Sequence, residues 1–351
     1  MKDGGIEKRP VSHPVGTMPA MYDMLGRVSR TFALSNRCLP RRFRRAMTLA
    51  YLLLRVSDFL EDNHVLRPRQ KRDLLRLWDL ILAGVARKRQ LLRELRNVPI
   101  EDDDAEGEVA TRFPEIMKRL NRLPDPQHRV VVERVRETTR GMALWQERGD
   151  LGAPGSVFAC EEDLDDYMHY VAGIVGYMIT EVFSEVSALI AGRRHRLMPL
   201  GREYGLGLQT VNVIRGLRKD FQRGWVFVPR SFCEAEGLSP EELFDPEQLP
   251  RSIRVVQHLI AKAERHLLAG LSFVMKLPRS MHRVRLATMW PLLFAVRTLA
   301  ISRNNPQVLL GEAKISRREV KAIIRHTTAL GWSNAWLNHY YHVLLEDRSV
   351  A

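Results

Sequence analysis

Apolar residues recur along most of the chain at the three- and four-residue spacing of an amphipathic helix. One such face consists of Ala46, Ala50, Leu53, Leu54 and Ser57. The same period appears within residues 74–82, 131–142 and 253–267. Strand-like alternation is scarce, and the best candidate for a strand is the short segment WVFVP at 225–229. The pattern therefore predicts a protein built almost entirely of helices.

Polar stretches containing Gly, Pro or acidic residues interrupt this pattern every 15 to 30 residues, roughly the helix lengths of a bundle. The interruptions fall at residues 101–108, 123–127, 149–156, 234–250 and 276–280. Such spacing is typical of an all-α fold. Residues 1–18 are polar, with Gly and Pro, and predict a disordered leader. Because nothing marks a domain boundary, residues 19–351 are expected to form a single domain.

Targeting and redox signals are weak. The N-terminal stretch lacks the apolar core of a signal peptide. We also find no run of roughly 18 apolar residues, so no membrane-spanning helix is expected. Cys38, Cys160 and Cys233 lie far apart and form no CxxC pair, which argues against a zinc site or a disulfide framework. A cytoplasmic location is expected.

The net charge of +14 over 351 residues narrows the choice of partners. It favours polyanions: nucleic acid, anionic lipid headgroups or a phosphorylated substrate. The Arg clusters at 41–45, 87–96 and 192–196 are dispersed and lack the interleaved aromatic residues of a stacking platform, so we expect no nucleic-acid partner. Residues 330–351 read as a packed amphipathic helix. These basic clusters and this helix are either ordinary solvated faces or a peripheral contact with the membrane surface. No oligomeric state is predicted.

Three carboxylates, Asp58, Glu61 and Asp62, follow an apolar run and share one face of the expected helix. Like charges at this spacing repel one another, and the helix dipole disfavours them at a C-terminus. Hard divalent ions such as Mg²⁺ bind carboxylate oxygens together with waters and substrate phosphates. The cluster is therefore either a solvated helix end or half of a metal site, and a second acidic segment would decide between them.

Four segments, in order, resemble the squalene and phytoene synthase family. Residues 29–63 are similar to its Ser-x-Ser/Thr-Phe element, Leu-Pro and Tyr-x-x-x-Arg-x-x-Asp-x-x-x-Asp helix. Residues 166–183 resemble Tyr-x-x-x-Val-Ala-Gly-x-Val-Gly. Residues 205–229 resemble Leu-Gln-x-x-Asn-Ile-x-Arg-Asp-x-x-x-Asp followed by Gly-Arg-x-Tyr/Phe-x-Pro, and residues 303–321 look more like the squalene than the phytoene synthases.

The resemblance implies an all-α isoprenoid synthase-type bundle around a deep apolar cavity. It also implies a prenyltransferase of isoprenoid biosynthesis that joins two farnesyl diphosphates head to head, through presqualene diphosphate, to squalene. Mg²⁺, or Mn²⁺ in its place, and NADPH are the implied cofactors. Since no GxGxxG follows a strand, NADPH would need a site unlike the Rossmann fold.

Three alternatives remain open. One is an enzyme of part of the reaction, which makes presqualene diphosphate or hydroxysqualene. The second is a phytoene or dehydrosqualene synthase. The third is a non-catalytic protein that binds prenyl diphosphates or lipids.

The resemblance also implies roles for the residues that match the family's motifs. The implied metal ligands are Asp58, Glu61, Asp62 and Asp220. The implied catalytic residues are Tyr51, Tyr170 and Arg55. The implied substrate-binding residues are Ser29, Thr31, Phe32, Arg55, Val171, Gly173, Gly176, Gln209, Asn212, Arg215 and Lys314. The two glycines either admit a prenyl chain or allow tight helix packing. The tyrosines, Tyr167 included, either face a carbocation or phosphate or belong to the core.

The second acidic motif departs from the family pattern. Gly216 occupies a position where the family has Asp, and Trp225 replaces the usual Arg. This site has lost one metal ligand and one phosphate-binding cation. Four nearby cations are expected to bind diphosphate directly and offset the loss: Arg215, Arg218, Lys219 and Arg223. The alternative is a site that no longer catalyses the reaction.

Overall fold

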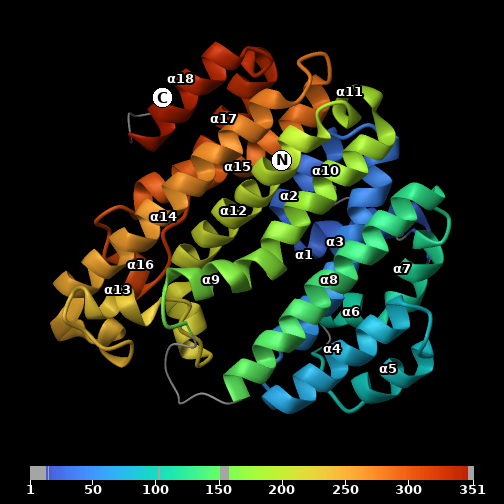
Figure 1. Cartoon of the computed structure of the whole chain (residues 1–351), viewed down its shortest axis with the longest axis horizontal. Coiled ribbons are helices and arrows are strands. Elements are labelled where there is room, and N and C mark those ends of the chain that lie inside the picture. Colours follow the sequence, from blue (N-terminus) through green and yellow to red (C-terminus); the bar gives the residue numbers. More distant parts are fainter. Residues whose placement is uncertain (1–12, 15, 102, 151–157, 347–351) are drawn as a thin grey trace, which may run out of the picture.

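The computed structural model describes residues 13–14, 16–101, 103–150 and 158–346. Within them the chain forms helices and no β-strand, which confirms the all-α prediction (Figure 1). The predicted strand at 225–229 is wrong. That segment is an irregular connection: the Trp225 amide donates to the carbonyl of Asp220, Val226 and Val228 are buried, and the rings of Trp225 and Phe227 stack.

The elements, in chain order, are α1 (Met18–Val28), α2 (Arg30–Cys38), α3 (Arg41–Asp62), α4 (Pro68–Leu82), α5 (Lys88–Leu95), α6 (Ala105–Thr111), α7 (Phe113–Leu120), α8 (Asp125–Asp150), α9 (Glu161–Met168), the π-helical turn η1 (His169–Gly173), α10 (Ile174–Val186), α11 (Ala188–Ala191), α12 (Arg194–Gln222), α13 (Arg230–Glu234), the 3₁₀ turns η2 (Glu241–Phe244) and η3 (Pro246–Gln248), α14 (Leu249–Lys276), α15 (His282–Ser302), α16 (Gln307–Leu310), α17 (Arg317–Leu330) and α18 (Asn334–Leu345).

The predicted interruptions mostly coincide with helix ends. α14 ends at Lys276 and α15 begins at His282, as expected from 276–280. The break at 101–108 is shorter than predicted, because Asp104 accepts hydrogen bonds from two backbone amides and starts α6. Short 3₁₀ turns occupy part of 234–250. Most of the break at 149–156, and most of the predicted leader, lie outside the described residues.

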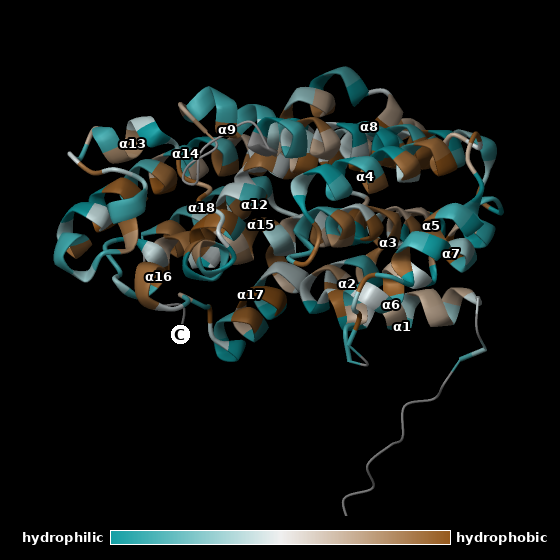
Figure 2. Cartoon of the chain, turned by 90° about the horizontal axis from the view of Figure 1, so that it is seen from below, coloured by the Kyte–Doolittle hydropathy of each residue, from teal (hydrophilic) through white to brown (hydrophobic). Residues whose placement is uncertain are grey.

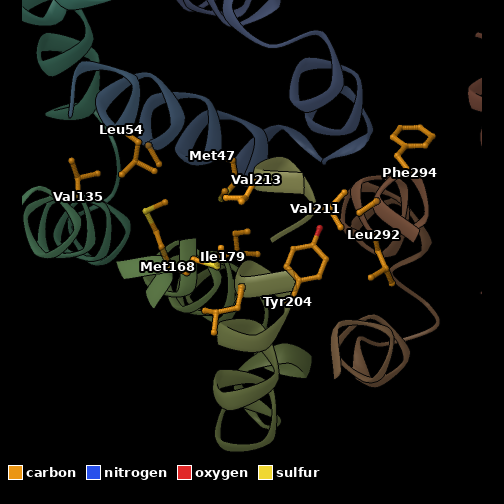
Figure 3. Close-up of a cluster of buried hydrophobic side chains, with 14 of the residues drawn as sticks. Met47, Leu54, Val135, Met168, Ile179, Tyr204, Val211, Val213, Leu292 and Phe294 are labelled. Carbon is orange, nitrogen blue, oxygen red and sulfur yellow. The ribbon is translucent and has the colours of Figure 1, made fainter. Parts of the chain in front are cut away.

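The apolar faces predicted from the sequence form the core. All five residues of the α3 face are buried, as are Trp78, Val131, Val135 and Leu267 on the other helices. Hydrophilic residues lie mainly on the outside of the bundle and hydrophobic residues within it (Figure 2). Figure 3 shows side chains from six helices meeting in this core: Met47 and Leu54 (α3), Val135 (α8), Met168 (α9), Ile179 (α10), Tyr204, Val211 and Val213 (α12), and Leu292 and Phe294 (α15).

α12 is the central helix and packs against α10, α14 and α15. Its approach to α10 depends on glycine. A Cβ at Gly176 would lie 1.8 Å from the carbonyl oxygen of Gly201, and one at Gly205 would lie 2.2 Å from that of Ala172. A Cβ at Gly173 would meet side chains of His169, Leu206 and Arg202. These contacts support the helix-packing role of Gly173 and Gly176, and their contact with a prenyl chain stays a prediction.

One described helix, α15, is long and apolar enough to cross a membrane by length and composition alone. Arg285 and Arg297 interrupt its apolar run, and the finding does not contradict the sequence-based expectation of no membrane-spanning helix. In the structure 89% of its most apolar 18-residue window is buried inside the protein, as in a core helix. The predicted terminal helix is confirmed as α18, which buries Leu337, Tyr340, Tyr341 and Leu344.

Gly176→Ala is expected to lower the free energy of unfolding by about 1–3 kcal/mol, because the new methyl group must separate α10 from α12. Gly26→Ala is the matched control: Gly26 lies in α1, and a Cβ added there would have no atom within 4 Å, so the change should be neutral or slightly stabilising. Urea unfolding of both variants measures the difference. Equal stabilities would contradict this packing role.

Candidate active site

The last turn of α3 presents Asp58, Glu61 and Asp62, and a cation reaches them from the turn before. The Arg55 Nη1 atom donates to Asp58 Oδ2 at 2.7 Å, and Arg55 Nη2 lies 3.1 Å from Glu106 Oε1 of α6. Burial raises the pKa of Asp58 to about 6, although Arg55 opposes the shift. At this end of α3, desolvation therefore changes the pKa of Asp58 more than the attraction of Arg55 does.

Glu61 is the most enclosed of the three carboxylates, with 5% of its surface exposed. Burial raises its pKa well above the usual range, and the charges of Asp62 and Asp58 add to the shift, while a hydrogen bond with Gln146 of α8 opposes it. Its Oε1 atom is buried with no hydrogen-bond partner. A buried carboxylate oxygen without a donor is costly unless a cation approaches it.

Asp220 belongs to the last turns of α12 and faces the α3 carboxylates. Its pKa is raised to about 6, first by burial and then by the negative charge of Asp62, while Arg223 and Lys219 oppose the shift. The buried Tyr167 of α9 responds to the same charges. Its pKa is raised well above the usual range by burial and then by the charges of Glu61, Asp62, Asp58 and Asp220. Two acidic helix ends therefore meet around one tyrosine.

The cation missing at position 225 has a substitute from elsewhere in the fold. Lys71 of α4 is only 5% exposed, and its Nζ lies 5.7 Å from the centre of the Trp225 ring. Burial lowers the pKa of Lys71, and the charges of Asp62 and Glu61 oppose that shift. Trp225 stacks on Phe227, which stacks on Tyr167, with ring centres 5.6 Å apart in both pairs. The ammonium group of Lys71 therefore lies close both to the aromatic stack and to the carboxylates of Asp62 and Glu61.

A second group of predicted residues gathers around Arg55. The rings of Phe32 and Tyr51 stack with centres 4.4 Å apart, and the Arg55 guanidinium lies 5.6 Å from the Tyr51 ring centre. Ser29 caps α2 by accepting a hydrogen bond from the Phe32 amide and also hydrogen-bonds Tyr51. Burial raises the pKa of Tyr51, so its hydroxyl keeps its proton and remains a donor. Thr31 is exposed on α2.

Tyr170 does not join the carboxylates. Its ring lies against Gly141 of α8, where a Cβ would come within 2.1 Å of it, and it lines an outer pocket with Glu137 and Arg140. Tyr167 is therefore the tyrosine that lies beside the carboxylates, and the catalytic role expected of Tyr170 stays a prediction. The π-helical turn η1 begins between the two tyrosines and changes the face that each presents, which helical periodicity alone does not reveal.

The remaining predicted residues lie mainly along α12. Gln209 is half-buried, and Asn212 and Arg215 are exposed. Arg215 Nε lies 3.4 Å from Glu312 Oε1, and Lys314 pairs with the same carboxylate, so Lys314 does lie beside α12. Val171 is half-buried and packs against the hydrophobic core. Three contributors were missed from the sequence, Lys71, Gln146 and Glu106, because each comes from a different helix and matches no motif.

The described residues contain no group of three or more His, Cys, Asp or Glu side chains that could hold a metal by themselves. The donor set nevertheless fits a hard divalent ion. Glu61 offers a buried oxygen without a partner, and Asp62 and Asp220 face each other with raised pKa values. Mg²⁺ commonly takes one or two carboxylates and completes its shell with waters and phosphate oxygens. Such a site would be completed by its substrate.

A family model described as squalene/phytoene synthase matches residues 25–319. The squalene synthase of Rattus norvegicus is 26% identical over 326 residues, which span 92% of this chain and 73% of the relative. The squalene synthase of Eremothecium gossypii is 28% identical over 332 residues, 94% of this chain and 72% of its own. A solved structure described as TcSQS with the ligand BPH1237 shares the fold, with a TM-score of 0.79 and 23% identity over 95% of this chain and 92% of that one.

Asp220→Asn is expected to raise the melting temperature of the metal-free protein at pH 8, because it removes a charge disfavoured by burial and by Asp62. The native pKa is raised from 3.8 to about 6, so ionisation weakens the folded state as the pH rises through this window. The advantage of the variant must therefore shrink at pH 5. Asp103→Asn, at an exposed position, is the control and should change little. A destabilised Asp220→Asn protein at pH 8 would contradict this account.

Proposed function

The chain belongs to the squalene/phytoene synthase family of prenyltransferases, and we propose that it condenses two farnesyl diphosphates head to head to form squalene. The observation that carries the proposal is the meeting of the α3 and α12 carboxylates around Tyr167. A diphosphate leaves only when the charge that develops on it is neutralised. Acidic and basic side chains gathered at one place are what a metal-bound diphosphate requires.

Asp58, Glu61, Asp62 and Asp220 would hold Mg²⁺, with Mn²⁺ as an alternative. When bound, the ion would supply Lewis-acid neutralisation of the diphosphate oxygens. Lys71 and Arg223 each lower the pKa of Asp62, so both lie near this carboxylate. They would provide fixed positive charge beside the bound diphosphate. Arg55 would reach the same phosphate after exchanging its contacts with Asp58 and Glu106. These side chains orient the leaving group before its bond breaks.

Ionisation of one farnesyl diphosphate leaves an allylic cation, which the double bond of the second molecule attacks. The released diphosphate then takes a proton from the coupled cation as the cyclopropane ring of presqualene diphosphate closes. Aromatic rings stabilise a cation over their faces. The stack of Tyr167, Phe227 and Trp225 provides such faces beside the carboxylates. The hydroxyl of Tyr167 keeps its proton because its pKa is raised, so it can donate a hydrogen bond to the departing diphosphate.

We propose that NADPH delivers the hydride of the final step. The described residues contain no strand, so the dinucleotide must bind without a Rossmann unit. Arg215 and Lys314, which share Glu312, present exposed cations beside α12 that suit its phosphates. We also place the enzyme in the cytoplasm, since all three cysteines are free thiols.

Gly216 favours a second candidate function, an enzyme that stops at presqualene diphosphate or an alcohol. A Cβ at Gly216 would meet only the flexible end of the Asp220 side chain, so α12 has room for a second carboxylate here but presents a single one. If this site binds the diphosphate group of presqualene diphosphate only weakly, the second ionisation would be slowed more than the first.

Incubation with radiolabelled farnesyl diphosphate and Mg²⁺ distinguishes these functions. We expect squalene when NADPH is present and presqualene diphosphate to accumulate when it is withheld. Presqualene diphosphate or an alcohol under both conditions would support the second candidate. Protein that releases no diphosphate would contradict both, and would leave a binding protein on this fold.

Lys71→Met is expected to lower kcat/KM for farnesyl diphosphate by about 100-fold, because the variant removes a buried positive charge next to the leaving group. Lys71→Arg should recover part of the activity. Lys88→Met on α5 is the matched control for loss of a lysine, and it should retain wild-type rates. Steady-state kinetics of the three variants tests this role, and a twofold or smaller effect of Lys71→Met would exclude it.

A further inference from the structure

The excess positive charge of the chain is concentrated at one end of the bundle. Four segments at helix ends contribute: residues 37–45, 185–196, 276–283 and 325–333. Together they contain twelve Lys or Arg residues and one acidic residue, Glu185, which accounts for most of the net charge of +14. In the part of the chain that the structure describes, Arg194 alone among these twelve forms an ion pair, with Glu181. The remaining charge is available to an external partner.

Side-chain contacts with backbone carbonyls join the four segments into one surface, here called the basic end. Arg283 Nε donates to the carbonyl of Cys38 at 2.8 Å, and His282 Nε2 lies 3.0 Å from the carbonyl of Thr328. Arg193 Nη1 donates to the carbonyl of Lys276 at 2.8 Å. Figure 1 shows α11 and α17 towards the same edge of the molecule, with α5 at the opposite edge.

The basic end also exposes large apolar side chains. Leu189 is 59% exposed, Leu330 44% and Trp332 55%. Leu189 follows Ser187, which contacts Met281, and Leu330 and Trp332 follow Thr328. Apolar and tryptophan side chains surrounded by arginines are unfavourable in water but suit the boundary between lipid headgroups and acyl chains.

We propose that the basic end docks on the surface of a bilayer containing anionic phospholipid. Each Lys or Arg near such a surface adds electrostatic attraction, so a few of these side chains are enough for reversible binding. Leu189, Leu330 and Trp332 then enter the headgroup region and add apolar burial. A nucleic acid fits less well, because a strand-binding surface would interleave several aromatic rings with the cations.

The basic end and the carboxylates lie at opposite ends of α3 and α12, so docking could assist release of the product. This consequence rests on the proposed function. α3 and α12 both begin at the basic end and end at the carboxylates. From Arg41 to Asp58 is seventeen residues, or about 25 Å of helix. An apolar product that leaves the bundle at the basic end would enter lipid instead of water.

Flotation with phospholipid vesicles tests the docking without substrate, so its outcome is independent of catalysis. Wild-type protein should float with vesicles that contain phosphatidylglycerol, but not with pure phosphatidylcholine, and salt should release it. The triple variant Arg41→Glu/Arg42→Glu/Arg279→Glu should bind at least about tenfold more weakly. Leu189→Ser/Trp332→Ser should weaken binding while leaving its salt dependence unchanged.

Two matched controls keep the result specific. Arg89→Glu/Arg93→Glu/Arg96→Glu reverses the same number of charges on and just after α5, and Leu268→Ser/Leu310→Ser removes similarly exposed leucines elsewhere. Both should bind vesicles within about twofold of wild type, and circular dichroism should show all four variants folded. Equal losses in test and control variants, no binding to anionic vesicles, or tighter binding to duplex DNA than to vesicles would each overturn the proposal.

Discussion

Repulsion among four carboxylates in a partly desolvated space is the constraint on which the functional part of this structure depends. Asp58, Glu61 and Asp62 end α3, and Asp220 lies near the end of α12, so the fold itself holds like charges together. The raised pKa values of all four show that the protein alone does not neutralise them. Such an arrangement weakens the folded state and is retained where a cation completes it.

The cations supplied by the chain surround this cluster without filling it. Arg55 approaches from within α3, Lys71 from α4 and Arg223 from the loop after α12. Because they come from separate elements, a diphosphate and its metal ions can be enclosed from several sides. The Nζ atom of Lys71 lies over the Trp225 end of the aromatic stack that runs to Tyr167, and under the proposed function the rings of this stack would stabilise the allylic cation.

The sequence predicted those parts of the site that depend on local spacing. The face of α3 and its three terminal carboxylates follow from helical spacing, whereas Asp220 was implied by the resemblance of residues 205–229 to a family motif. Lys71 could not be found in this way, since its position depends on how α4 packs against the segment after α12. The position of Tyr167, and not Tyr170, beside the carboxylates depends on a π-helical turn that no local signal marks. The two glycines were ambiguous until the backbone of α12 was seen to lie against them. The positions of Lys71 and the two glycines therefore depend on long-range packing, and that of Tyr167 on a local change of helix geometry.

The most direct test of the central claim is calorimetric titration of the protein with inorganic diphosphate, with and without Mg²⁺. If the facing carboxylates form a site completed by metal and substrate, diphosphate should bind tightly only when Mg²⁺ is present. Asp62→Asn and Asp220→Asn should each abolish that dependence. Diphosphate binding of equal affinity without Mg²⁺, and unaffected by either substitution, would show that basic residues alone hold it and would contradict the account.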